Sequence, residues 1–239
     1  GEWHAEVNCI DSVDKENRSL IENSTMYVSL EPCSHYGKTP PCVDLILKNK
    51  IGKVVIGCQD IYKEVAGQGI LKLNQAGVNV VEGVLEKECI QLNKRFFTFH
   101  QKKRPYIILK WAQTSDGKIG TENGKRILIS NDYSNRLVHK WRSEEAAIMV
   151  GTRTALKDNP SLTTRLWKGK NPIRIVIDND LKLPLDLKLF NQESKTLILN
   201  NIKNSEEQNV QYIKVEEDNF TEKALDCFYD LNIQSILVE

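Results

Sequence analysis

Short apolar runs alternate with helical periodicities along the first part of the chain. Three apolar or β-branched segments between turn residues predict strands: residues 25–30, 53–58 and 78–81. Four segments with apolar residues at helical spacing predict helices: residues 4–13, 42–49, 69–75 and 85–101. Strands that alternate with helices are typical of an α/β layer with parallel strands, so we expect this architecture here.

The pattern restarts after three basic residues and a proline, Lys102-Lys-Arg-Pro105. We place a domain boundary at this linker, which gives one α/β domain at residues 1–102 and a second at residues 103–239. In the second domain the apolar runs predict strands at residues 105–114, 146–150, 173–177, 196–199 and 235–238. Helices are predicted at residues 130–142 and 221–231. The polar run at residues 200–209 is predicted to be a surface loop.

Composition excludes several classes of protein. The 239 residues are 40% apolar and 27% charged, with a formal net charge of +1, as in a soluble globular protein. This balance argues against nucleic acid or a membrane surface as the partner, and no apolar run is long enough to span a membrane. The first residues have neither the basic nor the apolar region of a signal peptide, so we expect a cytoplasmic protein.

Two short stretches of the first domain predict a zinc site. One is His4-Ala-Glu6, and the other runs from Glu31-Pro-Cys33 to Cys42. One histidine and two cysteines are three ligands that suit Zn²⁺ and leave a fourth position for water, whose pKa zinc lowers towards neutrality. Glu6 is then the general acid/base. The order resembles the signature of zinc nucleobase deaminases, except that eight residues separate the two cysteines.

Cysteine usage fits a reducing compartment, because six cysteines in a chain of this length do not indicate a disulfide scaffold. Four of them lie in apolar patterns and are expected to be small buried hydrophobes: Cys9, Cys58, Cys89 and Cys227. Two alternatives stay open for the zinc site. One is a deaminase that acts on another base or on nucleic acid, with a non-catalytic second domain. The other is a structural zinc, which needs no carboxylate such as Glu6.

The second domain contains no complete catalytic motif, neither a GxGxxG pattern after a strand nor a P-loop. Three polar clusters follow predicted strands, where α/β proteins usually bind ligands: Lys110 with residues 115–118, residues 158–165, and Glu239. Taken alone, Asp158-Asn-Pro is more typical of a simple turn. Arg142, at the end of a predicted helix, is equally typical of a partner for the helix dipole.

The motifs of both domains together resemble one family. The loop between Cys33 and Cys42, residues 109–119, 150–154 and 158–165, and the closing Val238-Glu239 occur in the order of bifunctional riboflavin-biosynthesis enzymes. These enzymes join a diaminohydroxyphosphoribosylaminopyrimidine deaminase to an amino-phosphoribosylamino-uracil reductase. The resemblance implies an N-terminal cytidine-deaminase-like three-layer α/β/α domain, followed by a dihydrofolate-reductase-like α/β domain that binds NADPH.

The resemblance also assigns roles to residues. Zinc is bound by His4, Cys33 and Cys42, and Glu6 moves protons. The expected contacts of the deaminase substrate are His35, Lys38 and Asp60. The expected contacts of the reductase substrate are Arg142, Asp158, Arg165 and Glu239, with the Arg142 fork suited to a phosphate. The expected cofactor contacts are Lys110, Ser130 and Thr154. The implied reactions are hydrolytic deamination of a phosphoribosylated pyrimidine and then hydride transfer from NADPH to its ribosyl chain.

Both ends depart from the family pattern. The family has a helix and a strand hairpin before the His-Ala-Glu helix, and it continues after the position of Glu239 into a glycine pair and further strands. We therefore expect a fragment of a longer chain in which some strand edges are unpaired. The resemblance further implies a small-molecule substrate and a homo-oligomer.

Overall fold

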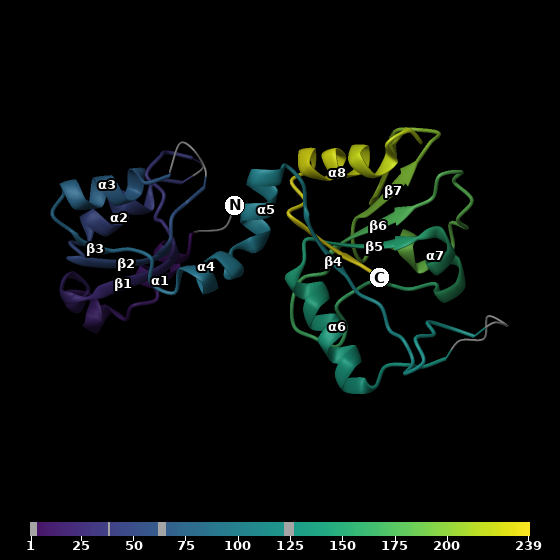
Figure 1. The fold of residues 1–239 in the computed structure, drawn as a ribbon, viewed down its shortest axis with the longest axis horizontal. Helices are drawn as coiled ribbons and strands as arrows, with labels where there is room; N and C mark the ends of the chain where they lie inside the picture. The colour runs from purple at the N-terminus through teal and green to yellow at the C-terminus, as the bar shows by residue number, and fades with distance from the viewer. Residues whose placement is uncertain (1–3, 38, 62–65, 122–126) are drawn as a thin grey trace. The chain divides into compact units, whose positions relative to one another are not determined.

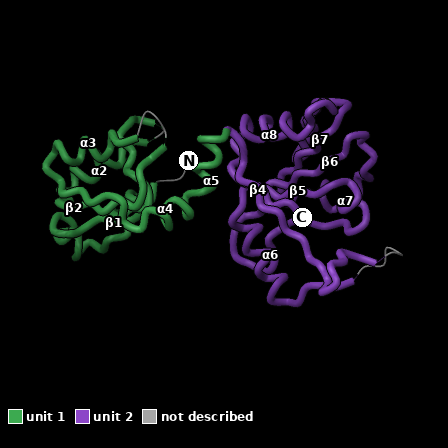
Figure 2. The backbone as a smooth tube through the Cα atoms, viewed as in Figure 1, with its two compact units in different colours: residues 1–102 green, residues 103–239 purple. Residues whose placement is uncertain are grey.

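The structure is a computed structural model that describes residues 4–37, 39–61, 66–121 and 127–239. The chain divides into two compact units, residues 1–102 (unit 1) and residues 103–239 (unit 2) (Figure 2). Each unit has its own sheet, with one apolar core in unit 1 and two in unit 2. None of the helices in the described part of the chain has the length and apolar character needed to cross a membrane.

Unit 1 contains a parallel sheet in the order β1-β2-β3, as the apolar runs predict. The strands are β1 (Thr25–Leu30), β2 (Lys53–Cys58) and β3 (Asn79–Val81). The helices of unit 1 are α1 (Ala5–Asp11), η1 (Lys15–Asn23), α2 (Cys42–Lys48), α3 (Gln68–Gln75), α4 (Glu86–Leu92) and α5 (Lys94–Lys102). Figure 1 shows α1 to α5.

Alternation along β2 separates the two faces of this sheet. Val54 and Ile56 enter a core with apolar residues of α1, α2 and α3. Gly57 faces the opposite side, where a Cβ would lie 2.1 Å from the Sγ of Cys89 on α4. Only a glycine lets α4 come this close to the strand. Helices therefore cover both faces, which confirms the three-layer arrangement expected for the first domain.

The helix predicted at residues 85–101 is wrong as a single element. α4 ends at Leu92, α5 begins at Lys94, and Asn93 lies between them. The side-chain amide of Asn93 donates to the carbonyl of Cys89 at 2.9 Å, and the Asn93 backbone N–H uses the same acceptor. A side chain that competes for helix carbonyls is a common cause of such an interruption.

Unit 2 contains a seven-stranded sheet in the order β4-β10-β5-β6-β7-β9-β8. All its strand pairs are parallel except β8 with β9. The strands are β4 (Tyr106–Leu109), β5 (Ala147–Gly151), β6 (Ile173–Ile177), β7 (Thr196–Asn200), β8 (Ser205–Glu207), β9 (Val210–Lys214) and β10 (Ser235–Val238). The helices are α6 (Asp132–Glu144), α7 (Thr152–Asp158), η2 (Lys188–Phe190) and α8 (Phe220–Asp230).

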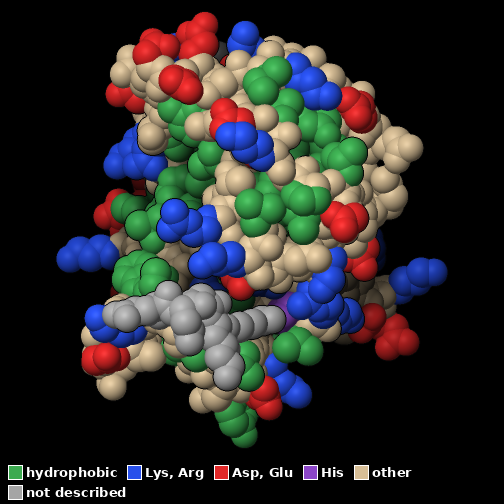
Figure 3. All heavy atoms as spheres, turned by 90° about the vertical axis from the view of Figure 1, so that its right-hand side faces the viewer, with side chains coloured by type: hydrophobic (Ala, Val, Ile, Leu, Met, Phe, Trp, Pro, Cys, Tyr) green, Lys and Arg blue, Asp and Glu red, His purple; other side chains and the backbone are tan. Residues whose placement is uncertain are grey.

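Side-chain alternation gives unit 2 two cores. Ile148 and Val150 of β5 enter a cluster that includes Ala155 of α7. Ala147 enters a second cluster with Phe228 of α8. On the face drawn in Figure 3, acidic and basic side chains are interspersed, and no single sign of charge covers it.

Two predictions for unit 2 are wrong in extent. The first strand ends at Leu109 instead of residue 114, because Thr114 closes a turn by donating its N–H to the carbonyl of Lys118. The polar run at residues 200–209 contains β8, which pairs antiparallel with β9, and β9 itself was not predicted. The polar edge strand β8 has no apolar alternation that the sequence would reveal.

Candidate functional site

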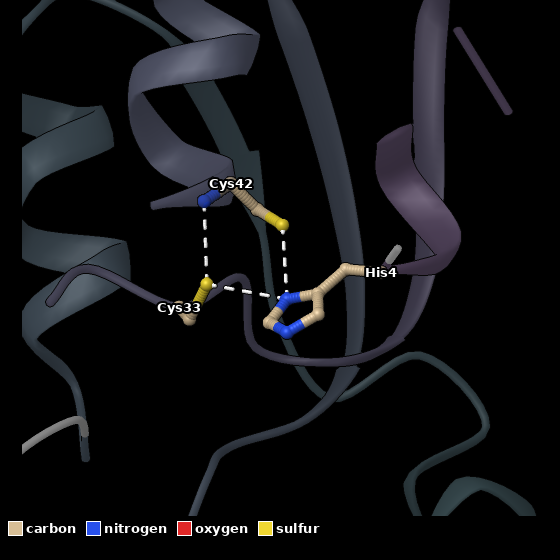
Figure 4. A group of neighbouring side chains, drawn as sticks. All are labelled: His4, Cys33 and Cys42. Carbon is tan, nitrogen blue, oxygen red and sulfur yellow. Dashed lines mark hydrogen bonds between the residues drawn. The ribbon is translucent and has the colours of Figure 1, made fainter. Parts of the chain in front are cut away.

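Three elements bring the predicted zinc ligands together. His4 caps the N-terminus of α1, Cys33 lies in the loop after β1, and Cys42 is the first residue of α2. The Nδ1 atom of His4 lies 3.5 Å from the Sγ of Cys33 and 3.3 Å from the Sγ of Cys42 (Figure 4). All three ligand atoms lie within 4.8 Å of one another. This is the one such cluster found among the described residues.

These separations fit a zinc ion. Typical Zn–S and Zn–N bonds with tetrahedral angles put a sulfur and a nitrogen about 3.5 Å apart. The two nitrogen–sulfur distances are 3.5 and 3.3 Å, close to that value. The donor set, one imidazole nitrogen and two sulfurs, is also one that zinc prefers. His4, Cys33 and Cys42 would therefore hold the metal with little movement, and three protein ligands leave one position open.

The two thiols differ in acidity. A hydrogen bond from the Cys42 thiol lowers the pKa of Cys33 to about 6, with help from the Cys42 backbone N–H and from His4. That N–H donates to the Sγ of Cys33 at 3.2 Å. The hydrogen bond to Cys33, burial and Glu6 raise the pKa of Cys42. The first N–H of α2 therefore stabilises the thiolate of Cys33.

Glu6 and two predicted substrate contacts share a cavity with two of the candidate ligands, His4 and Cys33. The cavity has a volume of about 830 Å³, and its lining includes His4, Glu6, Cys33, His35 and Asp60. The Glu6 carboxylate also lies near the Cys42 thiol, since it contributes to raising the pKa of Cys42. The structure thus places a carboxylate beside the candidate metal position. Lys38, the third predicted substrate contact, lies outside the described residues.

One buried carboxylate at this site was missed by the sequence reasoning. Glu31 is 3% exposed and accepts hydrogen bonds from four backbone N–H groups. A charged residue at the end of an apolar strand, just before Pro32-Cys33, is the signal that would have found it.

The remaining cysteines follow the expectation only in part. Cys58 is buried, and burial with nearby Cys89, Glu86 and Asp60 raises its pKa to about 11. Cys89 and Cys227 are half-buried, and the expectation of a buried Cys9 is wrong because this side chain is exposed. Cys9 lies on α1 and lines the same cavity as Glu6.

In unit 2, the carboxyl ends of neighbouring strands bring together predicted reductase residues. Lys110 follows β4 and Glu239 follows β10, and these strands pair in register. The Nζ of Lys110 lies 3.7 Å from Glu239. Arg142 on α6 donates from Nε and Nη2 to the two carboxylate oxygens of Glu239, at 3.1 and 2.8 Å. This bidentate pair occupies the guanidinium fork that was expected to contact phosphate.

A buried histidine adjoins this ion pair. His139 lies one helical turn before Arg142 on α6, and its Nδ1 accepts the backbone N–H of Arg165 at 3.0 Å. Burial and then the charges of Arg142 and Arg165 lower the pKa of His139, against a smaller opposing effect of Glu239. The Nη1 of Arg165 donates to the hydroxyl of Thr163 at 2.9 Å. His139 and Thr163 were not singled out from the sequence.

The other predicted reductase residues lie on or next to two helices of unit 2. Thr154 and Asp158 are on α7, which follows β5, and Ser130 precedes the Asn131 cap of α6. Among the hydrogen bonds and ion pairs of the described residues, none joins Asp158 to Lys110 or Glu239. The charge of Lys110 suits the phosphate groups of an anionic cofactor such as NADPH.

Two family models match the chain. The model described as RibD C-terminal domain matches residues 105–239, and the cytidine and deoxycytidylate deaminase zinc-binding region matches residues 1–58. Among curated relatives, riboflavin biosynthesis protein RibD of Actinobacillus pleuropneumoniae is 45% identical and is aligned with 83% of the chain. The Aquifex aeolicus protein of the same name is 37% identical and is aligned with all of it. The chain spans 52% of the first relative and 68% of the second.

Solved structures agree with these matches. The chain is similar to a diaminohydroxyphosphoribosylaminopyrimidine deaminase/5-amino-6-(5-phosphoribosylamino)uracil reductase from Thermotoga maritima, with a TM-score of 0.89 and 37% identity. This match covers all of the chain and 68% of that protein. Acinetobacter baumannii RibD is similar with a TM-score of 0.84 and 28% identity, over all of the chain and 67% of that protein.

Proposed function

Because this chain belongs to the RibD family of riboflavin biosynthesis proteins, we propose that it carries two consecutive activities. The first is zinc-dependent hydrolytic deamination of diaminohydroxyphosphoribosylaminopyrimidine. The second is NADPH-dependent reduction of the ribosyl chain of the aminouracil product to a ribityl chain. The observation that carries the proposal is the convergence of His4, Cys33 and Cys42, with Glu6 near Cys42 and lining one cavity with His4 and Cys33.

In the deaminase site, the chain's own residues bind substrate and move protons. A zinc ion on His4, Cys33 and Cys42 supplies Lewis-acid activation of water. Glu6 takes a proton from the attacking water and delivers it to the leaving amine, which departs as ammonia. His35 and Asp60 line the cavity and hold the pyrimidine, with Lys38 proposed as a third contact. If the zinc were only structural, the Glu6 carboxylate would have no proton to transfer.

In the reductase site, the edge formed by Lys110 and Glu239 receives the sugar. NADPH supplies the hydride. Lys110 and Asp158 are our candidates for orienting the ribosyl chain, with Ser130 and Thr154 proposed as cofactor contacts together with Lys110. Glu239 is held by Arg142 and faces the Lys110 ammonium.

Two arginines were predicted near the substrate, and the geometry favours Arg165 for the phosphate. The fork of Arg142 is engaged by Glu239, so a phosphate contact from Arg142 would first require that ion pair to open. The side chain of Arg165 is exposed and has a hydroxyl as its partner. A guanidinium in this state can bind a phosphate without breaking an ion pair.

We also propose a cytoplasmic location, a small-molecule substrate and a homo-oligomer. All six cysteines are free thiols, which supports a reducing compartment. The net charge of +1 supports a small-molecule substrate over nucleic acid. Sedimentation of the purified full chain would measure the oligomeric state.

The substitution Glu6→Gln tests the deaminase assignment. Because the amide cannot accept and return a proton, we expect ammonia release to fall by at least about a hundredfold, while zinc remains bound in a one-to-one ratio. The same variant, when supplied with the deaminated product, should still oxidise NADPH. Glu16→Gln, at an exposed position of η1, is the matched control.

Each outcome separates one part of the proposal from the rest. Ammonia release that survives Glu6→Gln would show that another group shuttles protons. Zinc without ammonia release in the unsubstituted full chain would indicate a structural metal or another substrate. Deamination without NADPH oxidation would contradict the reductase assignment alone.

A further inference from the structure

We propose that Glu31 is a positioning residue of the deaminase site, whose carboxylate holds Asp60 at the wall of the cavity. The inference rests on the proposed deaminase function. It assigns a task to a buried charge that neither binds the metal nor moves protons. The task is to fix the backbone after β2, at Asp60 and at Gly67–Ile70, relative to the loop that carries Cys33.

The carboxylate of Glu31 collects four backbone donors. Its Oε2 accepts from the N–H groups of Asp60 at 3.2 Å and Gly67 at 2.9 Å. Its Oε1 accepts from Gly69 at 2.8 Å and Ile70 at 3.3 Å. An ionised carboxylate has acceptor sites for all four donors, whereas a neutral amide does not. Two of these donors belong to the first turn of α3, where backbone N–H groups have no partner within the helix.

The position of Glu31 is set by the sheet. Its backbone N–H donates to the carbonyl of Cys58 at 3.0 Å, which extends the pairing of β1 with β2. The carboxylate therefore starts from a fixed point two residues before Cys33. Buried carboxylates are costly unless hydrogen bonds compensate them, so this arrangement is stable only when the four donors are in place.

Helix α3 lies directly against the loop of the zinc ligands. A Cβ at Gly69 would lie 2.2 Å from the carbonyl oxygen of Pro32, so only glycine fits there. Lys72 on the same helix donates from Nζ to the carbonyl of Ser34 at 2.6 Å. Glu31 thus joins two segments that are already in close contact, and it holds the Asp60 backbone to them by one hydrogen bond.

The metal ligands have supports that do not involve Glu31. The N–H of Val43 donates to the carbonyl of Cys33 at 3.1 Å, and the N–H of Cys42 donates to the Sγ of Cys33 at 3.2 Å. Loss of the Glu31 charge should therefore displace Asp60 more than it displaces the ligands. Since Asp60 lines the cavity, the expected consequence is weaker substrate binding with zinc still in place.

The substitution Glu31→Gln in the zinc-loaded full chain tests this inference. Glutamine keeps the shape but turns one acceptor into a donor, which faces two of the four N–H groups. We expect KM for the diaminopyrimidine ribosyl phosphate to rise at least about tenfold while kcat changes less than about threefold. Zinc content and the reductase activity should stay unchanged. Glu82→Gln, at an exposed position after β3, is the matched control.

A second measurement is independent of turnover. Amide hydrogen exchange at Asp60, Gly67, Gly69 and Ile70, measured by NMR, should accelerate in Glu31→Gln and remain unchanged in Glu82→Gln. If the unsubstituted chain released no ammonia, the proposed function would fail, yet this exchange would still test the hold on Asp60. Unchanged exchange would overturn the inference. The inference would also be overturned if Glu31→Gln lost zinc and if its kcat and kcat/KM fell equally, because Glu31 would then act through the metal.

Discussion

At the scale of single residues, the chemistry of a side chain depends on which backbone group it meets. Cys33 and Cys42 are the same residue type, yet the pKa of Cys33 is lowered and that of Cys42 is raised. The difference arises because the N–H and the thiol of Cys42 both donate to Cys33. The motif identified both as ligands, but the direction of this hydrogen bond depends on the loop geometry.

His139 gives a prediction at the same scale. Its folded pKa is lowered by burial and by Arg142 and Arg165, with Glu239 opposing. The unfolded chain, with an ordinary histidine pKa of about 6.5, then binds more protons than the folded chain below that pH. The neutral imidazole therefore contributes stability above about pH 6.5, and this stability is lost as the pH falls below it.

The measurement compares the unsubstituted chain with His139→Asn by urea unfolding between about pH 5 and pH 8, a range that brackets the ordinary histidine pKa. Other titrating groups cancel in the difference between the two chains. We expect the stability advantage of the histidine over the asparagine to shrink as the pH falls below about 6.5. Parallel curves across the whole range would contradict this prediction.

At the scale of elements, apolar periodicity located most helices and strands of both units, because packing one face against a core requires it. It failed where a polar side chain decides the outcome. Asn93 interrupts the helix between Leu92 and Lys94, and the polar β8 pairs only because β9 lies beside it. Apolar periodicity over a short stretch of sequence detects neither the interruption of this helix nor the pairing of β8.

Arg174 on β6 gives a prediction for this scale. It is 0% exposed, and its guanidinium donates to the carbonyls of Lys188, Asn191 and Ser194 and to the side chain of Asn191. The residue therefore ties η2 and the chain after it to the sheet. Arg174→Leu should lower the free energy of unfolding by about 3 kcal/mol, because several buried carbonyls lose their donor.

Denaturant unfolding measures this loss, with Arg136→Leu at an exposed position of α6 as the control. A loss below about 1 kcal/mol would contradict this prediction, because it would mean that water or nearby residues donate hydrogen bonds to these carbonyls in place of the arginine.

At the scale of the whole molecule, the division into two compact units limits how far a local change can act. The candidate zinc ligands all belong to unit 1, and the Lys110–Glu239–Arg142 cluster belongs to unit 2. Each unit has a core of its own, so each can respond to its ligand separately. A metal that binds only the folded form stabilises the unit that contains its ligands.

Removal of zinc by a chelator should therefore destabilise unit 1 and leave unit 2 unchanged. Calorimetry of the full chain should show one transition moving to lower temperature, by an amount equivalent to about 3–4 kcal/mol when zinc was present at a few hundred times its dissociation constant. Zinc added back should restore it, and Cys42→Ser should behave like the chelated chain. Equal shifts in every transition would show that the units unfold together.

The sequence by itself predicted the candidate zinc ligands and Glu6, the alternation of strands and helices, and the polar residues at strand ends. These features are encoded over short stretches, where spacing and periodicity suffice. The tertiary structure alone decided which distant groups meet. Arg142 and Glu239 pair across 97 positions of sequence because β10 inserts between β4 and β5. Glu31 meets Gly67–Ile70 because β1 lies beside β2. Such contacts depend on strand order, which no local pattern specifies.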